Sequence, residues 1–159
     1  MRVLLAVDGS ECSDTAVKEI ASRPWPAGTE IKIVSAFQIP LTPTPEAWAI
    51  PDDYYEQMEQ SVGGHAQAVV DLATRALAKD PDTSVHVESE VLPGSPRAAI
   101  LEEADRWNAD LIVVGSHGYG AWQRFLLGSV SQAVVSHAKC SVEVVRCRPA
   151  AGAVEKKAA

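Results

Sequence analysis

The residues best placed to do chemistry in this sequence lie in a glycine-rich segment over positions 115–131. Gly115-Ser116-His117-Gly118 begins the segment, and Gly128-Ser129 follows ten residues later. Glycines at 115 and 118 allow backbone N–H groups to approach a ligand where a Cβ atom would intrude. Gly128-Ser129 opens a predicted helix, whose free N–H groups and positive dipole end favour a phosphate. The segment has neither the lysine of a Walker A loop nor the spacing of a G-x-G-x-x-G motif, so we predict an anion site built from backbone donors.

A second polar group, Asp8-Gly9-Ser10, follows the first predicted strand. Asp8 could contact a ligand there, or it could cap the helix that follows. Ser129 also has two interpretations, because Ser129-Val130-Ser131-Gln132 is a capping box that needs no ligand. The two roles of Ser129 can coexist, since its side chain satisfies one N–H group while other donors face a phosphate.

Three further groups of residues could take part in catalysis, phosphate binding or metal binding. His117 has no aspartate or nucleophile placed by the sequence to form a triad, so we predict no catalytic residue. Arg124 is the only cation of the glycine-rich segment, and it could bind a γ-phosphate or point into solvent. His137-x-x-Cys140 has metal-ligand spacing but no second pair nearby, so we predict no metal site made from protein ligands alone.

Strands and helices that alternate along the chain must position these residues. Apolar runs predict the strands, and apolar residues at helical spacing predict the helices. Gly63-Gly64 lies inside the second helix and predicts a kink or break, while residues 38–52 contain four prolines and predict a loop. The expected strands are 3–7, 31–37, 85–91, 111–114 and 141–145, and the expected helices are 11–23, 52–78, 95–107 and one that begins near Ser129.

This order predicts a doubly wound α/β fold: one five-stranded parallel sheet with helices on both faces. Strands 85–91 and 141–145 alternate polar and apolar residues, which is typical of sheet edges, whereas 3–7 and 111–114 are wholly apolar. The predicted strand order is then 3-2-1-4-5, and the winding reverses between the first and fourth strands. We expect a ligand cleft beyond the carboxyl ends of those two strands.

Composition restricts the class of protein. The chain has 159 residues, 47% of them hydrophobic, with 14 basic and 21 acidic side chains and a formal net charge of −7. We expect one domain over residues 1–147 and a flexible tail over 148–159. The acidic balance argues against nucleic acid as a partner, and no apolar run is long enough for a membrane span. Three widely spaced cysteines predict a reducing compartment, the cytoplasm, rather than a disulfide framework.

The glycine spacing resembles that of the universal stress proteins. Their nucleotide-binding members carry G-x2-G-x9-G-[S/T], which this sequence matches with Gly115, Gly118, Gly128 and Ser129. The first strand, which ends in Val-Asp-Gly-Ser at residues 7–10, also resembles the family, and the match covers residues 1–147. Ser141 departs from the family pattern, which often has proline there.

The resemblance implies a Rossmann-like, ATP-binding domain (with ADP or AMP as alternatives) that carries Mg²⁺ on the phosphates and acts as a homodimer in the stress response. Asp8 would contact the ribose or adenine, and the main chains of Ala6 and Ala36 would line the adenine pocket. The first two glycines of the motif would flank the ribose and α-phosphate, and the start of the last helix would hold the β- and γ-phosphates. The implied binding residues are Ala6, Asp8, Ala36, Val114, Gly115, Gly118, Gly128, Ser129, Val130 and Ser131.

Nucleotide occupancy would then modulate the conformation or the partners of the protein. Two alternatives stay open. One is a dimeric stress protein that binds no nucleotide and pairs through the last strand near Val142 and Val144, since exposed strand edges need to be covered. The other is a weak ATPase, although the sequence offers no evident general base.

Overall fold

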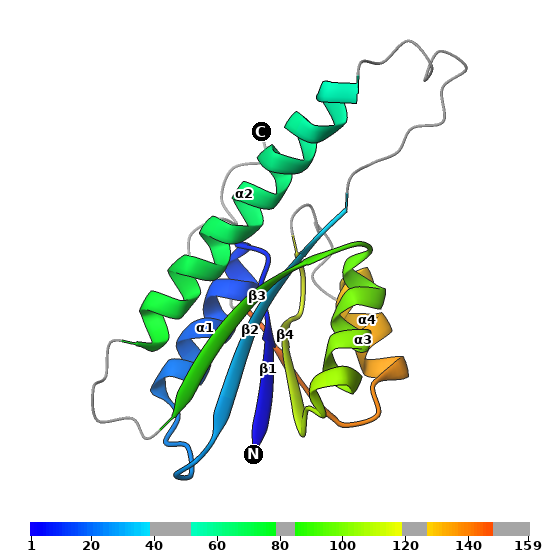
Figure 1. Ribbon diagram of the computed structural model, residues 1–159. Coiled ribbons are helices and arrows are strands. Elements are labelled where there is room, and N and C mark those ends of the chain that lie inside the picture. Colours follow the sequence, from blue (N-terminus) through cyan, green and yellow to red (C-terminus); the bar gives the residue numbers. More distant parts are fainter. Residues whose placement is uncertain (39–51, 79–84, 119–126, 148–159) are drawn as a thin grey trace, which may run out of the picture.

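Five parallel strands form one sheet in the order β3-β2-β1-β4-β5, which confirms the predicted order (Figure 1). The computed structural model describes residues 1–38, 52–78, 85–118 and 127–147. The strands are β1 (Arg2–Ala6), β2 (Glu30–Phe37), β3 (His86–Pro93), β4 (Leu111–Gly115) and β5 (Ser141–Val145). The helices are α1 (Glu11–Ser22), α2 (Asp52–Leu77), α3 (Pro96–Trp107) and α4 (Ser129–His137). Each element lies close to its predicted bounds.

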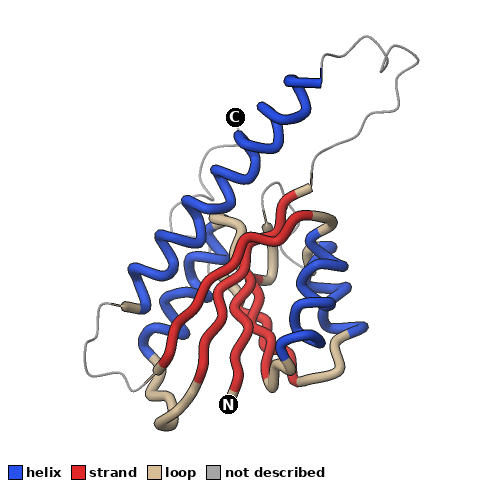
Figure 2. Tube along the Cα trace, viewed as in Figure 1, coloured by secondary structure: helices blue, strands red, loops and turns tan. Residues whose placement is uncertain are grey.

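The helices form two layers, one on each face of the sheet (Figure 2). α1 and α2 cover one face, and α3 and α4 cover the other. Side chains of a strand alternate between faces, so β1 serves both cores in turn. Val3 and Leu5 pack with α1 and α2, whereas Leu4 and Ala6 pack with α3 and α4. Burial on both faces therefore explains why the sequence of β1 is wholly apolar after Arg2.

α2 does not break at Gly63-Gly64, and the predicted interruption is wrong. The helix continues from Asp52 to Leu77. A Cβ atom at Gly63 would lie 3.5 Å from the Phe37 ring, an ordinary van der Waals distance, so the end of β2 packs against the helix at this position. Burial of the α2 face that carries Val70 and Ala73 offsets the low helix propensity of the two glycines.

The edge strands are β3 and β5, as their alternating sequences predict. On β5, Val142 and Val144 pack against the α3/α4 core, while the Arg23 guanidinium donates hydrogen bonds of 2.9 and 2.7 Å to Glu143. Among the described residues, no helix is long and apolar enough to cross a membrane. Most of the predicted 38–52 loop and the whole 148–159 tail lie outside the described residues.

A group of charged side chains, the ion cluster, lies between the sheet and α3, with two buried members and two that are exposed to solvent. It consists of Lys32, Glu90, Glu103 and Arg106. Lys32 is 7% exposed and Glu103 is 3% exposed. The Lys32 Nζ atom lies 2.6 Å from Glu90 Oε2 and 2.7 Å from Glu103 Oε1, and Arg106 forms ion pairs with the same two carboxylates. Every charge of the ion cluster therefore has an opposite charge beside it.

Candidate functional site

A cleft opens beyond the carboxyl ends of β1 and β4, where the winding of the sheet reverses. The described walls enclose about 280 Å³, close to the lower limit of roughly 300 Å³ for ligand pockets. All ten residues of the implied binding set line it: Ala6, Asp8, Ala36, Val114, Gly115, Gly118, Gly128, Ser129, Val130 and Ser131. The structure thus brings together, around one cavity, residues that are up to 125 positions apart in the chain.

The wall that follows β1 is a hydrogen-bonded turn. The Asp8 carboxylate accepts a 3.0 Å bond from the Ser10 N–H group through Oδ1. Ser10, and not Asp8, caps α1, because its Oγ atom accepts from the Ser13 N–H group at 3.3 Å. The Oδ2 atom of Asp8 points at Gly118, where a Cβ atom would collide with it. One oxygen of Asp8 therefore fixes the turn, and the other faces the cleft.

The wall that follows β4 packs tightly against α1. A Cβ atom at Gly115 would lie 2.9 Å from both the Cys12 carbonyl carbon and the Ser13 nitrogen. A Cβ atom at Gly128 would lie 3.3 Å from Ser116 O and from His117 Cα. The sequence predicts that these glycines are required for the approach of a ligand. In the structure each of them also lies against protein backbone, so the packing of the fold itself requires a residue without a side chain.

The N-terminus of α4 faces the cleft. Gly128 is its N-cap residue, with φ −60° and ψ 154°, and within the described residues no side chain caps this end. The predicted capping box at Ser129 is therefore absent from the described contacts, because Ser129 is already the first helical residue. The Ser131 hydroxyl donates a 2.6 Å bond to the Gly115 carbonyl oxygen, so it ties the helix to β4.

His117 lies on the cleft wall, but nothing described around it forms a triad. Its Nδ1 atom is 3.1 Å from Ser116 Oγ, and its carbonyl oxygen accepts a 3.2 Å bond from Ser10 Oγ. Its Nε2 atom is buried and has no hydrogen-bond partner among the described residues. Arg124, the predicted phosphate contact, lies outside the described residues. The charge that the described walls offer to an anion comes from backbone N–H groups rather than from cations.

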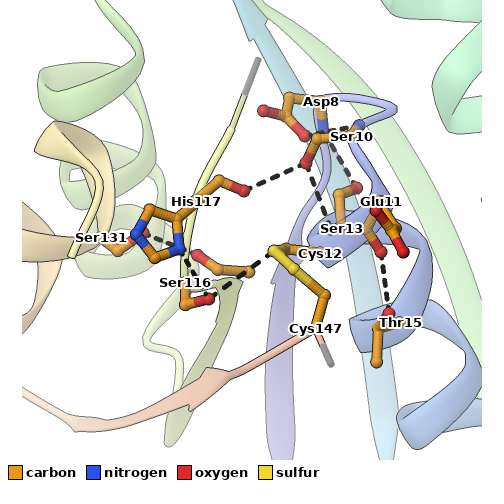
Figure 3. Close-up of a disulfide and its surroundings, with 11 residues drawn as sticks. Asp8, Ser10, Glu11, Cys12, Ser13, Thr15, Ser116, His117, Ser131 and Cys147 are labelled. Atoms are coloured by element: carbon orange, nitrogen blue, oxygen red, sulfur yellow. Dashed lines mark hydrogen bonds between the residues drawn. A yellow bond between two sulfur atoms is a disulfide. The ribbon is translucent and has the colours of Figure 1, made fainter. Parts of the chain in front are cut away.

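Cys12 and Cys147 form a disulfide beneath this wall, and the prediction that the cysteines stay unpaired is wrong (Figure 3). They are 135 residues apart in sequence, so their spacing does not indicate the pairing. The topology places them together because α1 begins at the carboxyl end of β1, and β5 ends at the same edge of the sheet. Cys140 is the free cysteine, partly buried beside α3.

Several residues that line the cleft lie outside the implied binding set. Pro96 and Ile100 enter the cleft from the first turns of α3. The sequence signal was present in part, since the carboxyl end of β2 and the start of α3 must lie at the same edge as the other loops. Val7 and Ser13 were not predicted in the cleft either, whereas His117 belongs to the glycine-rich segment that was predicted there.

The fold and the cleft define the class of protein: a doubly wound α/β domain with a ligand cleft at its topological switch point. The model of the universal stress protein family matches residues 1–146, and the chain belongs to this family. A curated relative from Staphylococcus aureus (strain USA300), assigned to the universal stress proteins, is 31% identical over 150 residues, which cover 91% of this chain and 82% of the relative.

Solved structures share the fold. The universal stress protein UspA from Lactobacillus plantarum is 26% identical with a TM-score of 0.75, and the match covers 92% of this chain and 97% of that one. A universal stress protein in complex with cAMP is also 26% identical, with a TM-score of 0.64 and coverage of 91% and 96%. More distant members of the same fold have been solved with AMP, from Arabidopsis thaliana, and with dAMP, from Archaeoglobus fulgidus.

Proposed function

We propose that the cleft binds an adenine nucleotide, ATP in the first place, and that the protein acts as a regulatory module of the stress response. The observation that carries this proposal is the convergence of the ten implied binding residues on one cleft at the switch point. The complex of a 26% identical family member with cAMP supports an adenine nucleotide as the ligand class.

The polarity of the cleft supports a ligand with one apolar and one anionic end. Ala6, Ala36 and Val114 provide apolar surface at the strand ends, where a planar base would fit. At the other end, the first N–H groups of α4 and its positive dipole end would bind phosphate oxygens. Asp8 Oδ2, which faces the cleft, would accept a hydrogen bond from a ribose hydroxyl or an adenine amino group.

Mg²⁺ would be held mainly by the phosphates and by water. Asp8 is the only carboxylate among the described residues that line the cleft, and one of its oxygens is used in the turn. One free carboxylate oxygen suits Mg²⁺, which usually takes one or two carboxylates together with substrate phosphates. When bound, the ion would neutralise phosphate charge.

We further propose that the protein acts in the cytoplasm as a homodimer in which β5 pairs with a second copy. β5 is an edge strand, and parallel edges attract further pairing unless they are covered. Val142 and Val144 already pack against the α3/α4 core, so backbone hydrogen bonds between the two β5 strands would make the main contribution to the dimer. Light scattering on the purified protein measures the mass; a monomer at micromolar concentration would contradict this pairing.

The central experiment asks what the protein carries and what it binds. Heat denaturation of the purified protein, followed by mass spectrometry of the supernatant, identifies any nucleotide that copurifies. Calorimetric titrations with ATP, ADP, AMP, cAMP and adenosine then rank the ligands. We expect adenine nucleotides to bind more tightly than adenosine, because only they reach the N-terminus of α4.

The absence of both a released nucleotide and binding heat at millimolar ATP would contradict the proposal. A universal stress protein that binds no nucleotide, the alternative reading of the sequence, would give that result. Equal affinity for ATP and adenosine would contradict the phosphate site but leave a nucleoside site in place.

A further inference from the structure

The disulfide between Cys12 and Cys147 touches the wall of the candidate cleft. Cys12 is the second residue of α1, and Cys147 follows β5. The Ser116 hydroxyl, on the wall that follows β4, lies 3.6 Å from the Cys12 sulfur and 3.1 Å from His117 Nδ1 (Figure 3). A covalent bond that can be made and broken thus lies one residue from the cleft lining.

Backbone contacts connect the same bond to the cleft. The Ser116 N–H group donates a 2.8 Å bond to the Val145 carbonyl oxygen, two residues before Cys147. Gly115 lies against the backbone of Cys12 and Ser13 with no room for a side chain. The Gly115–His117 wall therefore contacts both α1 and the end of β5, and the disulfide links these two segments covalently.

The chemistry at the two sulfurs is unequal. Cys12 is 4% exposed and lies in the first turn of α1, where the helix dipole and the Ser116 hydroxyl favour negative charge on sulfur, whereas burial and the carboxylates of Glu11 and Asp14 oppose it. Cys147 is partly exposed near the end of the described chain. An external thiolate can therefore attack the more accessible Cys147 sulfur, and Cys12 leaves as the thiolate.

We propose that the Cys12–Cys147 disulfide is a redox-sensitive clasp, opened by thiol–disulfide exchange with a small cellular thiol, and that the closed clasp raises nucleotide affinity. The idea rests on the proposed function of the cleft. In the first exchange, the thiolate forms a mixed disulfide with Cys147 and releases Cys12. A second thiol then attacks the mixed disulfide, so that two external thiols become one small disulfide while Cys12 and Cys147 become thiols. Oxidation by a small disulfide is the reverse.

The closed clasp favours binding because it holds the Gly115–His117 wall in the arrangement that the cleft requires. Opening removes the covalent link and leaves non-covalent contacts to hold that wall, among them the hydrogen bonds of Ser116 to Val145, Ser10 to His117 and Ser131 to Gly115. Cytoplasmic disulfides are usually transient and regulatory, which suits this role. Coupling is reciprocal, so bound ATP would make the disulfide harder to reduce by the same factor.

The test combines calorimetry with thiol counting on the full chain. ATP affinity is measured after equilibration in oxidised and in reduced glutathione, and alkylation with mass spectrometry reports which cysteines are free. We expect ATP to bind about tenfold more tightly in the oxidised protein. Bound ATP should lower the midpoint potential of the Cys12–Cys147 pair by the corresponding amount, about 30 mV.

Two variants separate the clasp from other thiol effects. Cys147→Ser should bind ATP as the reduced wild type does, with no response to glutathione, and circular dichroism checks its fold. Cys140→Ser, the matched control, should respond as the wild type does, because Cys140 lies outside the disulfide and burial raises the pKa of its thiol. If Cys147→Ser still shows the redox response, the clasp is overturned.

The remaining outcomes are also decisive. Equal ATP affinity in both redox states would overturn the clasp and leave the proposed function intact. No ATP binding in either state would overturn both. Failure of Cys12 and Cys147 to pair in oxidised glutathione would overturn the clasp whatever the affinity for ATP.

Discussion

The ion cluster and the cleft both contain polar groups next to the sheet. In the ion cluster these groups pair with one another, whereas in the cleft several of them face the cavity. In the ion cluster, Lys32 and Glu103 are nearly inaccessible to solvent, and every charge has a charged partner. In the cleft, the N-terminus of α4 has no side-chain cap among the described residues, and one oxygen of Asp8 faces the cavity. Polar groups that pair with one another contribute to the stability of the fold, whereas polar groups that face a cavity are available to a ligand.

This comparison predicts that mutations in the ion cluster change stability and leave ligand affinity alone. Replacing Lys32 with methionine keeps the length of the side chain but leaves Glu103 buried without its closest ammonium partner. We expect Lys32→Met to lower the free energy of unfolding by about 3 kcal/mol. Urea denaturation measures the loss, and calorimetry should show unchanged ATP affinity.

Two variants control for this prediction. In Lys32→Met/Glu103→Met the buried carboxylate that Arg106 alone would have to neutralise is gone, so part of the lost stability should return. Lys139→Met breaks the solvent-exposed pair with Asp105 and should cost less than about 1 kcal/mol. A Lys32→Met protein as stable as Lys139→Met would break the distinction between buried and exposed pairs.

Most of the fold could be predicted from the sequence, because each strand and helix has its own periodicity and right-handed crossovers restrict the topology. Contacts between segments that are distant in the chain could not be predicted from the sequence. The Phe37 ring packs against α2 at Gly63, and no periodicity indicates that contact. The Cys12–Cys147 pairing likewise requires knowledge of which strand ends are neighbours.

Most residues of the candidate site could also be predicted, since the glycine motif and Asp8 lie at strand ends that the topology brings together. The structural role of each individual residue could not be predicted. Gly115 is required by the backbone of α1, and Ser10 rather than Asp8 caps that helix. Both facts depend on distances between segments more than 100 residues apart or on the path of a turn, which residue types do not specify.

The glycines of the cleft offer a second way to test the comparison, because they serve the fold as well as the site. The Cβ atom of Gly115→Ala would approach the α1 backbone to 2.9 Å, so α1 or β4 must shift. We expect a loss of about 2 kcal/mol in the free energy of unfolding, together with weaker ATP binding. Urea denaturation and calorimetry measure the two effects.

Gly64→Ala is the matched control for Gly115→Ala. A Cβ atom at Gly64 would meet nothing within 4 Å, and the residue lies inside α2. Alanine there should stabilise the protein by up to about 1 kcal/mol without a change in ATP affinity. If Gly115→Ala were as stable as the wild type, the packing requirement at β4 would be disproved.

A smaller effect, confined to the ligand, should follow from Ser129→Pro. Proline is tolerated at the first position of a helix, and the extended Gly128 backbone suits the residue before a proline. The substitution removes one N–H donor from the end of α4 and keeps the helix. We expect about tenfold weaker ATP binding, roughly 1.4 kcal/mol, with unchanged affinity for adenosine.

Ser129→Ala removes the hydroxyl but keeps the backbone N–H group, so it should bind ATP more tightly than Ser129→Pro. Circular dichroism checks that α4 persists in both variants. If Ser129→Pro retained the full ATP affinity, the phosphates would have to lie elsewhere, and the cleft would lose the feature that separates it from the ion cluster.

The smallest expected effect is on the pH dependence of stability, and it arises in the ion cluster. A hydrogen bond from Lys32 lowers the pKa of Glu90 below its ordinary value of 4.5. Burial opposes charge on Lys32, but hydrogen bonds to Glu103 and Glu90 raise its pKa above 10.5. The contribution of Glu90 is therefore present above pH 4.5 and is lost as the pH falls through its lowered pKa, whereas that of Lys32 is lost only in strong alkali.

Glu90→Gln tests this assignment, because glutamine does not titrate. The wild type should be more stable than the variant at pH 7, and the difference in urea midpoint should shrink as the pH falls from 5 to 3. Glu59→Gln, on the exposed side of α2 and with no ion pair among the described residues, should show a smaller difference from the wild type at pH 7 than Glu90→Gln does. A Glu90→Gln difference that stays constant with pH would mean that Lys32 and Glu103 form the buried pair without help from Glu90.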